Sequence, residues 1–205
     1  VRKALNLSLD RNVITDKVLG QGQTPTYVFT PTYIEEGHLI QQPAYSKEPM
    51  AQRNEEAIKL LEEAGYSKAN PLKFSILYNT NENHKKVAIA AASMWKANTK
   101  GLIDVKLENQ EWKTYIDSRR AGRYDAARAG WNADYNQATT FGNYFLSNSS
   151  NNTAKYANPE YDKAIAESYV ATDAEGRAKA YAKAEEILAK DFGIVPIFNY
   201  VNPRL

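Results

Sequence analysis

Apolar residues recur at helical spacing over several stretches of the chain. In residues 1–19 they fall four positions apart, with charged side chains turned outward, which predicts a helix. The same spacing predicts helices over residues 50–65, 84–98, 111–121, from 159 to about 171, and from 174 onward. Asn158 and Asp173 are the expected N-caps of the last two helices, and Gly193 is expected to end the final one.

Other stretches have the period of strands. Alternating or continuous apolar residues predict strands over residues 72–78, 101–107, 124–131 and 194–201. Pro196 interrupts the last of these, which favours an edge strand or a bulge. Residues 23–49 hold four prolines and little periodicity. They are predicted to be a long irregular segment, and such segments are often functional.

The order of these elements predicts an α/β fold, a mixed sheet flanked by helices. Right-handed crossovers would bring the strand ends at Asn79 and Trp131 to the same edge of the sheet. A length of 205 residues suffices for one large domain or two small ones. We predict a single domain over residues 1–205.

Composition narrows the class of protein. No apolar run approaches the ~18 residues of a membrane helix. The net charge is +2 and the lysines are scattered among glutamates and not clustered, so no nucleic-acid partner is expected. The absence of cysteine excludes a thiol nucleophile and a thiolate metal site. It fits an oxidising compartment, although many cytosolic proteins also lack cysteine.

No pattern of catalytic residues is present. The two histidines, His38 and His84, do not stand in a zinc-binding HExxH spacing, and no GxSxG nucleophile motif occurs. Asp125 and Asp134 would lie about 20 Å apart along an extended strand, too far for a pair of carboxylates that cleaves glycosides. We therefore predict a binding protein and not an enzyme, with no cofactor and no metal.

The stretch 125–136 has the composition of a binding site. Arg128, Trp131 and Asp134 stand three positions apart, and Gly130 lets another backbone approach closely. Asp134 can pair with an ammonium, Trp131 can support a side chain, and a strand end can accept the main chain of an extended peptide. The residues alone leave open the alternative of a buried strand followed by a polar turn.

Other candidate ligand-binding residues also have alternative, structural interpretations. Arg119 and Arg128 can grip carboxylates, although an arginine in a strand more often pairs with a carboxylate of its own protein. Trp112 can be a flat apolar wall or a core residue. His84 can be a ligand contact or an exposed neighbour of a helix cap.

Five segments of the sequence together resemble a known family. They are VRKALNLSLDR at 1–11, NQEWKT at 109–114, ARAGWNADYN at 127–136, LSNSS at 146–150 and YVNPRL at 200–205. The combination resembles the periplasmic solute-binding proteins of the oligopeptide class, which serve ABC transporters, and looks most similar to the members that bind murein tripeptide.

The resemblance implies one lobe of a two-lobed receptor, a periplasmic binding protein of type II, cluster C. The chain is expected to be the C-terminal ligand-binding lobe, with both ends at the hinge and the other lobe absent. Asp134 would bind the amino terminus of the ligand, and Gly130 to Asn132 would offer a strand edge to its main chain, with Asn132 facing the cleft. Arg128, His84 and Arg119 would compensate carboxylates, Arg119 above all that of a γ-linked glutamate, and Trp112 and Trp131 would line side-chain pockets.

The resemblance also implies partners and a location. The ligand would be a murein tripeptide or another short peptide, the protein partners would be the complementary lobe and the membrane permease, and the compartment would be the periplasm. One lobe alone is expected to bind weakly or not at all, and its exposed cleft could support a weak homodimer. The alternative is an isolated scaffold domain with no ligand of its own.

Overall fold

The computed structural model describes residues 1–201, and their contacts group into two compact units. Among the described residues, the first unit comprises Val1–Pro25, Lys47–Ala129 and residues 197–201, and the second comprises Thr26–Ser46 and Gly130–Pro196. That the two units together form one domain stays a prediction. The last four residues of the YVNPRL motif lie outside the described residues.

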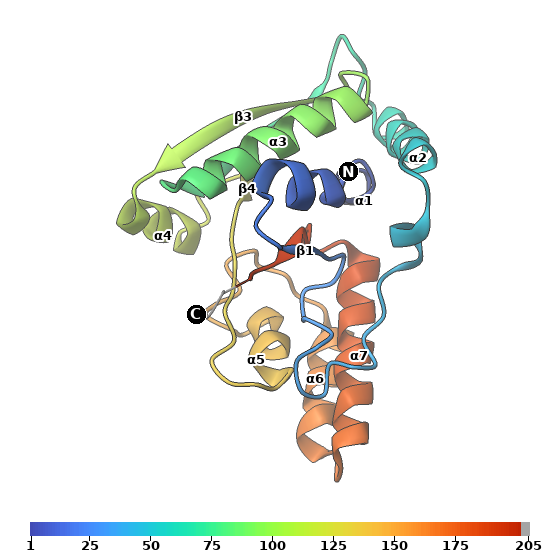
Figure 1. The fold of residues 1–205 in the computed structure, drawn as a ribbon, viewed down its shortest axis with the longest axis vertical. Helices are drawn as coiled ribbons and strands as arrows, with labels where there is room; N and C mark the ends of the chain where they lie inside the picture. The colour runs from blue at the N-terminus through green and yellow to red at the C-terminus, as the bar shows by residue number, and fades with distance from the viewer. Residues whose placement is uncertain (202–205) are drawn as a thin grey trace. The chain divides into compact units, whose positions relative to one another are not determined.

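The first unit contains a three-stranded parallel sheet. Its strands are β2 (Leu72–Asn79), β3 (Ile103–Gln110) and β4 (Ala126–Ala127), in the order β3-β2-β4. The edge strand β3 lies beside the helix α3 (Glu82–Asn98) in Figure 1. The middle strand is the most protected, and Leu77 within it is fully buried. This arrangement, with helices beside the sheet, confirms the predicted α/β class.

The strand predicted over residues 124–131 is much shorter in the structure. β4 pairs with β2 at only two positions, and the Arg128 amide adds one more bond to the Leu77 carbonyl at 2.8 Å. Before β4, the Asp125 carboxylate accepts hydrogen bonds from the amide and hydroxyl of Ser75 at 2.9 and 3.2 Å. A side chain thus takes the donor that a longer β4 would have used. After Arg128 the chain passes into the second unit.

The helices of the first unit are α1 (Arg2–Leu7), the π-helix η1 (Val13–Leu19), α2 (Met50–Glu63), α3 (Glu82–Asn98) and α4 (Trp112–Arg120). The single helix predicted over residues 1–19 is therefore wrong. The fully buried Arg11 donates to the carbonyl oxygens of Asn6 and Leu9 at 3.1 and 3.3 Å, so its guanidinium satisfies acceptors that a continuous helix would have bonded. Asp10 then accepts the Val13 amide at 3.2 Å as the next helical segment begins.

The predicted irregular segment is confirmed apart from two short elements. Thr24–Pro25 forms β1, which pairs antiparallel with β5 (Phe198–Asn199), and Ala44–Lys47 forms the 3₁₀ turn η2. The strand predicted over residues 194–201 is thus reduced to two residues, which lie beyond Pro196.

Helices build the second unit: α5 (Thr139–Gly142), the 3₁₀ turn η3 (Asn143–Phe145), α6 (Pro159–Val170) and α7 (Ala174–Asp191). Asn158 and Asp173 cap α6 and α7 through bonds from the Glu160 and Gly176 amides, as predicted. The end of α7 differs from the prediction, because Phe192 and not Gly193 adopts the left-handed conformation, with φ of 49°.

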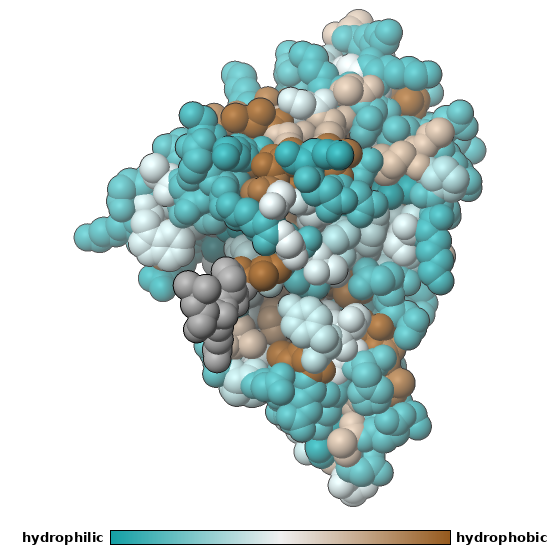
Figure 2. Space-filling view, in the orientation of Figure 1, coloured by the Kyte–Doolittle hydropathy of each residue, from teal (hydrophilic) through white to brown (hydrophobic). Residues whose placement is uncertain are grey.

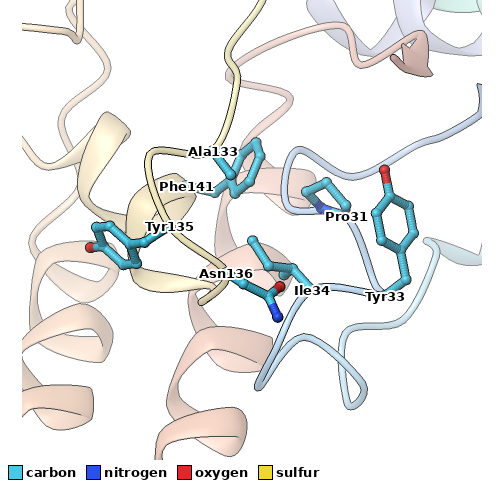
Figure 3. Close-up of a pocket in the computed structure, with 7 residues that line it drawn as sticks. All are labelled: Pro31, Tyr33, Ile34, Ala133, Tyr135, Asn136 and Phe141. Carbon is cyan, nitrogen blue, oxygen red and sulfur yellow. The ribbon is translucent and has the colours of Figure 1, made fainter. Parts of the chain in front are cut away.

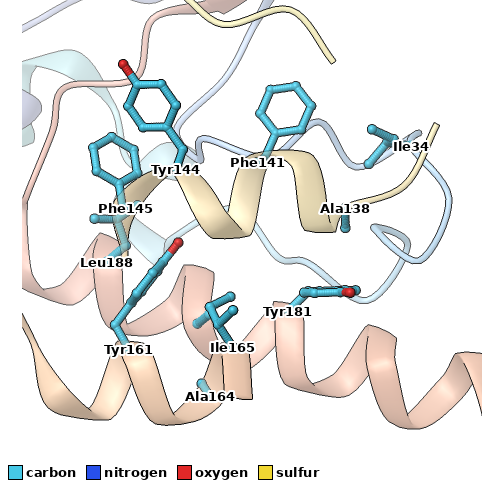
Figure 4. Close-up of a cluster of buried hydrophobic side chains, with 11 residues drawn as sticks. Ile34, Ala138, Phe141, Tyr144, Phe145, Tyr161, Ala164, Ile165, Tyr181 and Leu188 are labelled. Atoms are coloured by element: carbon cyan, nitrogen blue, oxygen red, sulfur yellow. The ribbon is translucent and has the colours of Figure 1, made fainter. Parts of the chain in front are cut away.

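The core of this unit lies between α5–η3 and the hairpin of α6 and α7 (Figure 4). Aromatic residues of α5–η3 pack there against the hairpin. Gly142 allows a close contact, since a Cβ at this position would lie 2.8 Å from the Ile165 Cδ1 atom and would displace that side chain. Tyr161 donates to the Gly142 carbonyl at 2.7 Å, and the hydroxyls of Thr139 and Tyr181 are 2.7 Å apart. The short helix α5 is thereby fixed to both helices of the hairpin.

A buried carboxylate connects α7 to the irregular segment. Glu185 accepts the amide of Phe29 at 3.1 Å and both the amide and the hydroxyl of Thr30, at 2.7 and 2.5 Å. Burial raises the pKa of the Glu185 carboxyl, and the hydrogen bonds from Thr30 and Phe29 oppose that increase. The segment 26–46 is thus held to α7 by polar contacts in addition to apolar packing.

We expect Glu185→Ala to reduce the free energy of unfolding by about 2–4 kcal/mol, because it leaves amide donors of Phe29 and Thr30 unsatisfied in a buried site. The neighbouring Glu186 is exposed and pairs with Lys190, so Glu186→Ala should cost less than about 0.5 kcal/mol. Urea denaturation of both variants measures the difference. Equal losses would contradict a structural role for Glu185.

Candidate functional site

The loop that carries Asp134 is fixed at its base and exposed at its carboxylate. The Asp134 amide donates to Thr140 Oγ1 at 3.2 Å, and the Asp134 side chain is exposed. Within residues 1–201, no cation forms an ion pair with this carboxylate. Asp134 is therefore presented to solvent from an anchored backbone, and a charged group of a ligand can reach it.

Trp131 is held by the same helix. Its indole Nε1 donates to the Thr140 carbonyl at 3.0 Å, and its ring lies edge-on to Tyr144 with centroids 5.1 Å apart. The indole is partly buried against the core of the second unit. Trp131 was predicted to line a pocket as a flat wall, but its N–H group and much of its surface are used within the protein.

The backbone of residues 130–132, beside the anchored Trp131 side chain and the Asp134 amide, is not paired with other backbone among the described residues. Gly130 and Asn132 are exposed, and no backbone–backbone hydrogen bond involves residues 130–132 in the described part of the chain. The segment is irregular and is not a strand. Its free amide and carbonyl groups can still bond to an extended ligand, as an exposed strand edge does.

A cavity of about 320 Å³ adjoins this loop (Figure 3). Its wall includes Ala133 and Tyr135, the two chain neighbours of Asp134, and Pro31, Tyr33 and Ile34 face them from the irregular segment. The volume is near the lower end of the range that holds small ligands.

A second carboxylate, which sequence reasoning missed, fixes the far end of the loop. Glu36 is buried and accepts Gln137 Nε2 at 3.0 Å and Arg177 Nε at 2.6 Å. The Ala138 amide donates to the Glu35 carbonyl at 2.9 Å. Glu36 adopts a φ of 65°, which is uncommon for a residue other than glycine, and nothing in the local sequence signals it. Thr140 was also missed.

Four of the predicted site residues belong to the first unit, and two of them interact. His84 Nδ1 lies 2.7 Å from Asn79 Oδ1; because this oxygen can only accept, Nδ1 carries the proton and Nε2 is left as an acceptor. Burial, and next the charge of Arg128, lower the pKa of His84 from 6.5 to about 4. His84 is therefore neutral at pH 7, and the positive charge of this pair resides on Arg128. A role of His84 beside ligand carboxylates stays a prediction.

Arg128 is not paired with a carboxylate in the described residues, contrary to the alternative considered from sequence. Its guanidinium lies over the ring of Tyr200, 5.5 Å from the centroid. Such a cation remains able to bind an anion with its outer nitrogens.

Arg119 and Trp112 both contact Tyr115 on α4. The Arg119 guanidinium is 5.5 Å from the Tyr115 ring centroid, and the Trp112 ring is 5.7 Å from it. The Tyr115 hydroxyl donates to the Arg128 carbonyl. Trp112 is 58% exposed, so it is not a core residue and its face can contact a ligand.

Each unit carries candidate ligand-binding groups of its own. The second supplies an exposed carboxylate with open backbone, and the first supplies two arginines and an exposed indole. Within residues 1–201, no group of three or more His, Cys, Asp or Glu side chains could hold a metal ion, and no helix is long and apolar enough to cross a membrane.

The chain is similar to known proteins over its whole length. The profile described as "Bacterial extracellular solute-binding proteins, family 5 Middle" matches residues 1–153. The periplasmic oligopeptide-binding protein OppA of Haemophilus influenzae is 97% identical over the whole chain, which spans 38% of that relative. A crystal structure of H. influenzae OppA in complex with RPPGFSPFR superposes with a TM-score of 0.98 at 96% identity, covering all of this chain and 40% of that one.

The periplasmic murein peptide-binding protein MppA of Escherichia coli is 44% identical over the whole chain, which again spans 38% of the relative. The predicted resemblance to oligopeptide-class periplasmic receptors is confirmed, and so are the predicted fold and the periplasmic location. The predicted preference for murein tripeptide is not supported, because a relative named for oligopeptides is far more similar. These relatives are named as binding proteins and not as enzymes.

We expect the His84 imidazole to titrate near pH 4 in an NMR titration of the folded chain. Arg128→Ala should raise this pKa only part of the way to 6.5, because burial, the larger cause, remains. Arg120→Ala removes an exposed cation from the end of α4 and should leave the His84 titration unchanged.

The lowered pKa of His84 also determines how this residue affects the stability of the fold as the pH changes. The contribution of neutral His84 is present above pH 6.5 and is lost as the pH falls toward 4, because the unfolded chain takes up the proton first. A His84 resonance that titrates near 6.5 in the folded chain would contradict this description of the site.

Proposed function

Because the chain belongs to family 5 of the bacterial extracellular solute-binding proteins, we propose that it binds the free amino end of a short oligopeptide as one lobe of a two-lobed transport receptor. It does so without chemical change to the ligand. The complementary lobe would close over the peptide, and a membrane permease of the ABC type would receive it. All of these roles concern a receptor of which this chain spans about 38% in the curated relatives.

The observation that carries the proposal is the environment of Asp134. Its carboxylate is exposed and has no ion-pair partner within residues 1–201, while its own amide is anchored. The structural carboxylates Glu36 and Glu185 differ from Asp134 in burial and bonding, because both are buried and accept hydrogen bonds from other residues of the protein. Asp134 is available to a ligand ammonium, and residues 130–132 are available to the main chain that follows it.

The remaining candidates would serve the rest of the ligand. Arg128 and Arg119 would hold carboxylates, and Trp112 would contact side chains. His84 would act as a neutral hydrogen-bond partner unless a ligand carboxylate raises its pKa. Relatives at 97% and 44% identity support ordinary oligopeptides over the murein tripeptide as the preferred class.

A weak homodimer stays a prediction. Trp112 and Tyr135 are 58% and 49% exposed, but Trp131, which was expected to join the exposed surface, is partly buried. On the face shown in Figure 2, hydrophobic residues lie in several separate areas and not in one continuous patch. The driving force for self-association on this face is correspondingly small.

Asp134→Asn should weaken binding of a peptide with a free amine by about tenfold or more, because an ammonium 3 Å from a carboxylate gains about 1.4 kcal/mol even at the dielectric constant of water. Calorimetry on the receptor formed by this chain and its complementary lobe measures the effect. Binding of the N-acetylated peptide should not change, and Glu186→Gln, which removes another exposed carboxylate of the second unit, should affect neither peptide. Equal weakening for both peptides would contradict the assigned role.

The class of ligand can be tested with the same receptor. We expect unmodified α-linked peptides to bind more tightly than the murein tripeptide with its γ-linked glutamate. Arg119→Lys keeps the charge and loses the planar fork, so it should reduce any murein tripeptide binding more than binding of a peptide without that carboxylate. Tighter binding of the murein tripeptide by the unmodified receptor would reverse this preference.

The isolated chain is expected to bind peptide with a dissociation constant in the millimolar range or weaker. In a closed cleft with an effective dielectric constant of about 20, the ammonium would gain about 5.5 kcal/mol, but an open site falls toward about 1.4 kcal/mol. Micromolar binding needs about 8 kcal/mol in total. Calorimetry that gives a micromolar dissociation constant for the chain alone would contradict the need for a second lobe.

A further inference from the structure

Thr140 contacts both groups that define the loop of the proposed site. Its Oγ1 accepts the Asp134 amide at 3.2 Å and lies 3.4 Å from Trp131 Nε1, while its carbonyl oxygen accepts the same indole at 3.0 Å. Thr140 is 6% exposed, so water does not readily replace these bonds. One buried residue thus holds the indole and the backbone of the exposed carboxylate together.

The position of Thr140 is itself fixed. The residue before it, Thr139, is hydrogen-bonded to Tyr181 of α7, and the carbonyl of Gly142 accepts the hydroxyl of Tyr161 of α6. Gly142 packs closely on Ile165, since a Cβ at Gly142 would lie 2.8 Å from the Ile165 Cδ1 atom and would force that side chain to move. The helix α5 is therefore a platform that cannot shift without disturbing the hairpin core.

The loop above this platform has little structure of its own. Residues 130–132 lack backbone–backbone hydrogen bonds in the described chain, and residues 132–136 are exposed. A segment of this kind samples many conformations unless it is tied down, and a ligand that must order it loses affinity. The bond from the Asp134 amide to Thr140 is the anchor nearest to the exposed carboxylate.

We propose that Thr140 is a positioning residue that orders Asp134 before a ligand arrives, an inference that rests on the proposed function of Asp134 as the partner of a ligand ammonium. It does not touch the ligand. Because Thr140 already orders the Asp134 backbone, a ligand that pairs with Asp134 loses less affinity to the conformational entropy of the loop.

Two variants separate the hydroxyl from the shape of the side chain. Thr140→Val keeps the branched shape and removes the acceptor, and Thr140→Ser keeps the acceptor and removes a methyl group. Ser168→Ala is the matched control, because Ser168 is a buried hydroxyl of the same unit that bonds the Ile165 carbonyl and does not contact the loop.

The first measurement needs no ligand. By hydrogen exchange in NMR, the Asp134 amide should exchange about tenfold faster in Thr140→Val than in the unmodified chain and Thr140→Ser. The Trp131 indole N–H keeps its bond to the Thr140 carbonyl, so it should change little and reports that α5 is still in place. An unchanged Asp134 amide in Thr140→Val would overturn the proposal.

The second measurement tests the consequence for binding. In the receptor with its complementary lobe, Thr140→Val should lower affinity for the peptide RPPGFSPFR about tenfold and leave its N-acetylated form unaffected, with Thr140→Ser near the unmodified value. Ser168→Ala should leave the ratio of the two affinities unchanged.

The outcomes are distinguishable. If the Asp134 amide loosens but free-amine binding is unchanged in Thr140→Val while Asp134→Asn weakens it, the positioning role is overturned and the proposed function stands. If neither variant affects free-amine binding, the assigned function of Asp134 fails, and the inference fails with it.

Discussion

The attachment of a four-residue helix to a helical hairpin is the constraint on which the candidate site depends. α5 is too short to be stable alone, and it exists because its groups are bonded to α6 and α7 and because Gly142 allows it to lie directly on Ile165. This contact fixes Thr140, and Thr140 fixes the loop that presents Asp134. The backbone of the exposed Asp134 is thereby fixed through contacts that lead back to the buried core of the second unit.

Two buried carboxylates also hold irregular parts of the second unit to its helices. Glu185 holds the irregular segment to α7 through Phe29 and Thr30, and Glu36 joins this segment to Gln137 at the end of the loop and to Arg177 of α7. Both acidic groups are bonded to donors of the protein, as buried charged groups must be. Asp134 differs from them in being exposed and without an ion pair in the described chain. The contrast between bonded and available carboxylates distinguishes the candidate site from the scaffold.

The sequence predicted the elements whose signal is local. The alternation of apolar residues located β2 and β3, and Asn158 and Asp173 marked the starts of α6 and α7. It overestimated β4, since the carboxylate of Asp125 takes a donor of Ser75, and it merged α1 with η1, since Arg11 satisfies the carbonyls between them. Thr140, Glu36 and Glu185 had no local signal, because their roles depend on partners that are distant in sequence or on backbone geometry. Asp134 could be singled out from its neighbours Arg128, Gly130 and Trp131, but its anchored amide could not.

The pairing of a ligand ammonium with Asp134 can be measured on the ligand itself. A peptide labelled with ¹⁵N at its amino terminus, bound to the receptor that contains this chain and its complementary lobe, reports the pKa of that amine by NMR. A nearby carboxylate favours the charged form, so the pKa should rise above the value of about 7.7–8.0 that is usual for an α-amino group. A pKa that is unchanged or lowered on binding would show that the amine lies away from Asp134 and would contradict the proposed recognition.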